Sequence, residues 1–167
     1  MASFILRGLA PDTFAPLFLL PDVVLSARQM QRLTVPDTAT TGFPCRISLV
    51  DARPGEQVLL LPYQHQPAES PYRASGPIFV RRGARSAVLG TDEVPATMLR
   101  RLLSVRAYDH AHRIIAAEVC EGTAVAAWLQ ARFEDPAVDY VHVHHARYGC
   151  YSCRADRADR ADRADRA

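Results

Sequence analysis

Residues 42–82 read GFPCRISLVDARPGEQVLLLPYQHQPAESPYRASGPIFVRR, and they set the architecture that we expect for the chain. Side chains in residues 45–51 alternate between apolar and polar, which is typical of a strand with two unlike faces. Pro54-Gly55 favours a turn, because proline presets φ and glycine accepts a positive φ. The segment therefore predicts a hairpin over 45–62, a long loop over 63–75 and a third strand over 78–82.

The rest of the chain adds more strands and one longer helix. Residues 102–108 and 113–119 alternate like a second hairpin, and residues 138–145 predict the last strand. A helix over 123–134 carries an apolar stripe that would lie on a sheet, formed by Val125, Trp128, Leu129 and Phe133. We expect an α+β fold: a single domain with a curved, mainly antiparallel β-sheet of about six to eight strands, the longer helix packed on it and short N-terminal helical turns.

The domain is expected to cover residues 1–153. Residues 154–167 repeat Arg-Ala-Asp, a period that fits neither the helical nor the strand pattern of amphipathicity. We interpret them as a low-complexity tail that packs on nothing.

Composition excludes several classes of protein. The net charge of +2 is too small to favour nucleic acid or an acidic membrane as a partner. The chain has no uncharged apolar run long enough to span a membrane, and its N-terminus lacks the pattern of a signal peptide. We therefore expect a cytoplasmic protein whose four cysteines are mostly free thiols. All 20 basic residues are arginine, which is typical of a GC-rich bacterial gene.

Five segments occur in an order that resembles one bacterial family: FILRGL, PCRISLVDARPGEQVLLLPYQHQ, SPYRASGPIFVR, RLLSVRAYD and VHVHHARYGC. The family is catalogued as domain of unknown function 1203, and the resemblance spans about residues 3–153. It implies no established activity. Members of the family end soon after the Gly-Cys segment, so the Arg-Ala-Asp tail departs from the pattern.

Arginine and histidine side chains recur at i, i+2 spacing on the predicted strands, so they share strand faces. Guanidinium groups on a rigid sheet suit the bidentate capture of a carboxylate or phosphate. If the faces coincide, they would form one pocket, to which the long loop adds residues. The expected ligand-binding residues are Arg46, His65, Tyr72, Arg73, Arg81, Arg106, Tyr108, His142 and His144. In the alternative reading, these polar faces simply meet water.

Metal and thiol chemistry are the weaker interpretations. His142 and His144 could share a Zn²⁺ or Fe²⁺ with His65, but no carboxylate completes a motif, so we predict neither metal nor cofactor. A single Cys150-x-x-Cys153 pair is best read as incidental cysteines. Cys45 is expected to face the core and not to act as a nucleophile.

Two hypotheses about function follow. The first is a small protein that binds, or acts on, an anionic small molecule in an Arg/His-lined pocket; it requires the candidate side chains to converge in one cleft. The alternative is a non-enzymatic protein–protein interaction module, with an exposed apolar patch or a homodimer contact and no small-molecule site.

Overall fold

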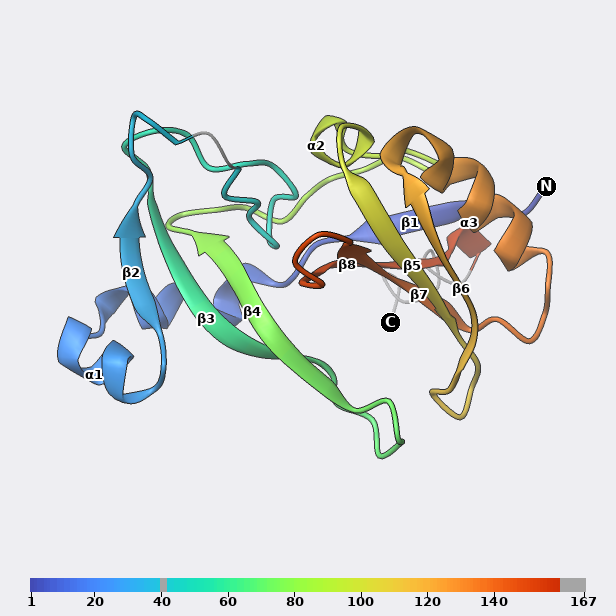
Figure 1. The fold of residues 1–167 in the computed structure, drawn as a ribbon, viewed down its shortest axis with the longest axis horizontal. Coiled ribbons are helices and arrows are strands. Elements are labelled where there is room, and N and C mark those ends of the chain that lie inside the picture. The colour runs from blue at the N-terminus through green and yellow to red at the C-terminus, as the bar shows by residue number, and fades with distance from the viewer. Residues whose placement is uncertain (40–41, 160–167) are drawn as a thin grey trace.

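The computed structural model describes residues 1–39 and 42–159, and its eight strands form two antiparallel sheets (Figure 1). The larger sheet has the order β1 (Phe4–Arg7), β8 (Tyr151–Arg157), β7 (Tyr140–His145), β5 (Leu102–Tyr108) and β6 (Ile114–Glu121). The smaller has the order β2 (Gln31–Thr34), β3 (Gln57–Gln66) and β4 (Ala74–Arg81). The α+β class, the strand number and the mainly antiparallel pairing are confirmed, with the strands divided between two sheets.

The expected short N-terminal helical turns and the one longer helix are both present. Short 3-10 turns at Pro11–Thr13 and Ala15–Leu19 precede α1 (Asp22–Ala27) near the N-terminus, and α2 (Ala96–Leu99) precedes β5. The longer helix is a 3-10 turn at Gly122–Ala124 that continues into α3 (Val125–Phe133). No helix in the described part of the chain is long and apolar enough to cross a membrane.

The larger sheet buries one face against α3. Val105 on β5 and Val143 on β7 are fully buried there with Leu129 of the helix, so the apolar alternation of these strands did identify their core face. Of the predicted helical stripe, Val125, Leu129 and Phe133 are buried, whereas Trp128 is half-buried. The opposite face of this sheet is the polar one, and it turns toward β3.

The expected hairpin over residues 45–62 is wrong. Residues 44–51 form a compact loop, joined by isolated bridges between Pro44 and Asp51 and between Cys45 and Phe79. Leu49 takes a left-handed φ of 56°, which no regular strand contains. The alternation did mark the buried side chains, because Cys45 is 1% and Leu49 is 5% exposed. Burial can alternate along a loop as it does along a strand, so the pattern located the core without fixing the backbone.

β3 pairs with β2 and β4, and both β3 and β4 are longer than the sequence predicts. Leu59 pairs with Arg32 of β2 and with Val80 of β4. A register shift lies between Tyr63 and Gln66, where β3 continues to residue 66. The connection to β4 is therefore residues 67–73, a shorter loop than the expected 63–75.

β8 is the second correction. Residues 154–157, which we assigned to the tail, complete a strand that lies between β1 and β7, and Ala155 is fully buried. Phe4 pairs with Arg157 across the sheet. The interpretation that the tail packs on nothing is therefore wrong for these four residues. Residues 160–167 lie outside the described part of the chain.

Candidate functional site

The candidate site begins on the polar face of the larger sheet, where a histidine lies between two arginines. His142 on β7 pairs with Arg106 of β5 on one side and with Arg154 of β8 on the other. Directly opposed residues of antiparallel strands point to the same face, so the three side chains are neighbours. Their position follows from the alternation that places Val141 and Val143 in the core.

This face does not meet water along β7. His142 is 3% exposed and His144 is fully buried, because the second sheet covers them. His65 of β3 stacks on Tyr151 of β8 with ring centroids 5.4 Å apart and an angle of 10° between the planes. The His65 ring also meets His144 edge-on at 5.0 Å. The alternative reading, in which polar strand faces are solvated, is wrong for β7.

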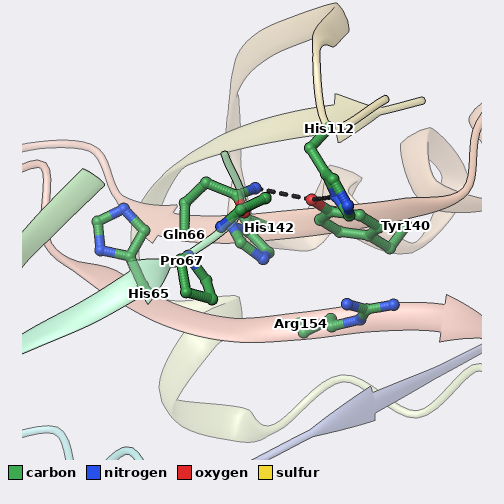
Figure 2. A pocket seen from close by; sticks show the side chains of 8 residues that line it. His65, Gln66, Pro67, His112, Tyr140, His142 and Arg154 are labelled. Atoms are coloured by element: carbon green, nitrogen blue, oxygen red, sulfur yellow. Dashed lines mark hydrogen bonds between the residues drawn. The ribbon is translucent and has the colours of Figure 1, made fainter. Parts of the chain in front are cut away.

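A pocket of about 310 Å³ opens beside these rings (Figure 2). Strand β3 and the loop after it form one wall, β7 and β8 form the other, and the turn between β5 and β6 closes one side. The lining residues are His65, Gln66, Pro67, Ala68, His112, Tyr140, His142 and Arg154.

The hydroxyl of Tyr140 is the centre of a hydrogen-bonded chain. Gln66 Nε2 donates to Tyr140 Oη over 2.7 Å, and His112 Nδ1 lies 3.0 Å from the same oxygen. Figure 2 shows both contacts converging on the phenol from opposite elements. The Tyr140 ring stacks on Tyr108 with centroids 5.0 Å apart, which fixes the direction in which the hydroxyl points.

The two arginines have few protein partners. The Arg154 guanidinium lies over the Tyr140 ring, 4.0 Å from its centroid, and its Nε donates to Asp156 Oδ1 over 2.7 Å. Among the contacts of the described residues, the terminal nitrogens of Arg154 have no hydrogen-bond partner. Arg106 Nε donates to Ser104 Oγ over a long 3.4 Å, and its guanidinium also forms a hydrogen bond with the Tyr108 side chain. Of the two cations, Arg154 is the one that the protein satisfies only in part.

The buried histidines are neutral. Burial, and then the charges of neighbouring imidazoles and arginines, lower the pKa of His142 to about 2. Burial likewise lowers the pKa of His144 to about 3. His144 Nδ1 donates to the carbonyl of Gly149 over 3.0 Å, so its Nε2 carries the lone pair. In the described part of the chain, His142 Nδ1, His144 Nε2 and His65 Nδ1 are buried and have no hydrogen-bond partner.

The structure brings only part of the predicted set to this pocket. His65 and His142 line it, and His144, Arg106 and Tyr108 lie directly behind them on the same face. Four predicted residues lie elsewhere. Arg46 is buried and donates to the carbonyls of Tyr151 and Pro44. Arg81 forms an ion pair with Glu56, in which Nη1 and Oε1 are 3.1 Å apart. Arg73 and Tyr72 are exposed on the loop after β3, and the Tyr72 ring lies at a steep angle to the Tyr108 ring.

Sequence reasoning missed Gln66, His112, Tyr140 and Arg154 as binding residues, although it did place Tyr140 on the same strand face as His142 and His144. Gln66 lies beyond the predicted end of its strand, and His112 lies just before the predicted strand over 113–119. Neither residue belongs to a motif. Arg154 was assigned to the repeat tail. A single signal could have found it, because Cys153 and Ala155 on either side of it have the spacing of the core face of a strand.

The cysteines and potential metal ligands add no second site. Within residues 1–39 and 42–159, no three His, Cys, Asp or Glu side chains are grouped so that they could hold a metal ion. The four cysteines are free, and Cys45 is buried in the core with its Sγ accepting from the Arg81 amide over 3.3 Å, as expected. Burial raises the pKa of Cys153 to about 12, which keeps it a thiol.

Comparison with known proteins gives one match. A protein-family model matches residues 42–157, which contain every residue that lines the pocket but neither β1 nor the N-terminal helical turns. No curated protein and no solved structure matches the chain. The matched segment covers more than half of the sequence, and the chain therefore belongs to the family described as "Protein of unknown function (DUF1203)".

Proposed function

We propose that the pocket binds a small anionic molecule, a carboxylate or phosphate, between the Arg154 guanidinium and the buried imidazole of His142. The observation that carries the proposal is the strand register, which sets His142 between Arg106 and Arg154. The Nε of Arg154 donates to Asp156, so its two terminal nitrogens are available to donate to a pair of ligand oxygens.

The electrostatics support an anion. After burial, the permanent charges that depress the pKa of His142 are those of Arg154 and Arg106, so the face has a positive potential. The His142 imidazole is neutral, so a bound oxyanion would be held by the two guanidinium groups on either side of it.

The size of the pocket favours a small metabolite. Its volume of about 310 Å³ lies at the lower end of small-molecule sites. The wall is mixed, with Pro67 and Ala68 opposite the polar groups, which suits a ligand that has a short carbon skeleton beside its anionic group. The proposal takes the protein to be bacterial and cytoplasmic, which its all-arginine basic composition and four free cysteines support.

Arg154→Gln is expected to weaken the binding of sulfate, a simple oxyanion probe, by about 10- to 100-fold, because a charge-assisted hydrogen bond contributes roughly 1.5–3 kcal/mol. Isothermal titration calorimetry at constant ionic strength measures the affinity. Arg147→Gln is the matched control, since Arg147 is exposed in the turn between β7 and β8, away from the lining residues.

Unchanged affinity in Arg154→Gln, an equal loss in both variants, or no saturable binding of sulfate to the wild-type protein would each overturn the proposal. Circular dichroism of Arg154→Gln checks that β8 is still formed. The hypothesis of a protein–protein interaction module stays a prediction, to which the pocket lends no support.

A further inference from the structure

The Tyr140 hydroxyl has a proton to donate, because the surrounding hydrogen bonds make its oxygen an acceptor from Gln66. Gln66 Oε1 accepts from the Ala68 amide over 3.3 Å, so the other end of its amide, Nε2, must donate to Tyr140 Oη. The phenol oxygen is thus already an acceptor. Its own hydrogen is left for His112 Nδ1, which lies 3.0 Å away, or for a ligand in the pocket that both side chains line.

His112 is held against Tyr140 by a turn that is costly to form. His112 has a φ of 58°, in the left-handed region that non-glycine residues seldom occupy. The Asp109 carboxylate stabilises this turn by accepting from the amides of Ala111 and Arg113, each at 2.9 Å. Ser70 Oγ, from the loop on the opposite wall, donates to the His112 carbonyl over 3.1 Å. The turn itself and the loop after β3 therefore hold the imidazole beside the phenol. Strained backbone conformations of this kind are often found at functional sites.

We propose that Tyr140 is a general acid, which donates a proton to the leaving-group oxygen of the bound ester as water cleaves the ester bond, and that His112 supplies the replacement proton. The substrate class is a small carboxylate or phosphate ester. This inference rests on the proposed function, because it takes the anion to lie between Arg154 and His142 within reach of Tyr140 Oη.

The step balances with water as the co-reactant. Water attacks the ester and loses a proton to solvent, and the bond from phosphorus or carbon to the leaving oxygen breaks with its electron pair on that oxygen. The O–H bond of Tyr140 breaks as a new O–H bond forms on the ligand. The phenolate oxygen then takes the Nδ1 proton of a His112 imidazolium, which becomes neutral imidazole and recovers a proton from solvent at the pocket mouth. One solvent proton has moved to the ligand oxygen, and no electrons have been exchanged.

The charged groups around the pair suit this role. Burial raises the pKa of Tyr140, so the phenol keeps its proton until the ligand takes it, while the nearby charge of Arg154 favours the phenolate that forms in passing. His112 is faced by Tyr140 of β7 and, within its own turn, by the ion pair of Arg113 and Asp109, whose Nη2 and Oδ2 are 2.7 Å apart. That pair is internally neutral, so it adds no net charge to the turn that carries His112.

The first experiment measures whether anion binding takes up a proton. Sulfate does not titrate near neutral pH, so any proton that enters with it belongs to the protein. Calorimetric titrations at pH 7 in two buffers of different ionisation enthalpy give the number of protons taken up. We expect a clear uptake, at most about one proton per sulfate, because the bound anion favours the imidazolium. His112→Asn should abolish that uptake while sulfate still binds; asparagine is chosen because it tolerates a positive φ.

The second experiment examines the pair in the free protein. Tyr140→Phe removes the hydroxyl but keeps the ring that stacks on Tyr108 and lies under Arg154. In the wild-type protein, neutral His112 should carry its proton on Nε2, because Nδ1 accepts from Tyr140. Nitrogen-15 NMR of the imidazole should show a shift toward the Nδ1–H tautomer in Tyr140→Phe.

The outcomes separate the two proposals. Absence of saturable sulfate binding overturns the proposed function. Sulfate binding with the same proton uptake in wild type and His112→Asn, or with no uptake in either, overturns the general-acid pair and leaves an anion-binding site. Identical imidazole spectra in wild type and Tyr140→Phe also overturn the pair.

Discussion

Lowering the pH from 7 to 5 is expected to reduce the free energy of unfolding by about 2 kcal/mol for each of three buried histidines. Burial lowers the pKa of His142 to about 2 and those of His144 and His145 to about 3, from the 6.5 of an unperturbed imidazole. Between these limits the unfolded chain binds protons that the folded protein does not. Stability is therefore fully present above about pH 6.5 and is lost as the pH falls below it.

Urea denaturation at pH 7, 6 and 5 measures this loss. His144→Gln should remove about a third of the pH dependence, since one of the three histidines no longer titrates. His110→Gln is the control, because it removes a histidine whose side chain is 66% exposed and leaves the three buried ones in place. A stability that stays constant from pH 7 to pH 5 would show that the three imidazoles are not shielded from protons.

Gly8→Ala is expected to lower the free energy of unfolding by about 4 kcal/mol, an exceptional cost for one methyl group. A Cβ at this position would lie 2.1 Å from the carbonyl oxygen of Ile47, so a backbone segment has to move. The contact is held by the Leu9 amide, which donates to the Arg46 carbonyl over 2.7 Å. Here the segment after β1 meets the loop of residues 44–51.

The measurement is equilibrium denaturation of Gly8→Ala beside Gly76→Ala. Gly76 makes a good control because a Cβ there would meet no atom within 4 Å and its φ is not positive. We expect that control to stay within about 1 kcal/mol of wild type. Equal stabilities of the two variants would mean that the close approach at Gly8 is not maintained in solution.

The parts of the fold that could be predicted are those in which side-chain periodicity and backbone agree. β5, β6 and α3 lie where the sequence places them. The buried residues of β5 follow a period of two, and those of α3 follow the period of a helix. The loop around Ile47 shows the limit of this reasoning. Its alternate residues are buried as in a strand, yet Arg46 satisfies carbonyl groups that strand pairing would otherwise satisfy. Burial was predictable there and hydrogen bonding was not.

The site was harder to predict than the fold because it depends on how two sheets meet. His142 and His144 were placed on one face correctly, but nothing in a single strand says whether another sheet covers that face. Arg154 was missed because a repeated Arg-Ala-Asp segment has the composition of a tail. Tertiary pairing with β1 and β7 makes its first residues an inner strand in spite of that composition.

The position of β8 also constrains when the protein can become complete during translation. β1 is synthesised before the other described strands, yet its partner β8, which contains Arg157, is synthesised after them. Until then the N-terminal strand has no edge to join, and β7 is exposed on one side. The β2–β3–β4 sheet can form much earlier from consecutive segments. The nascent chain is therefore expected to form its smaller sheet first and to close the larger sheet, with the Arg154 side of the pocket, only once β8 has been synthesised.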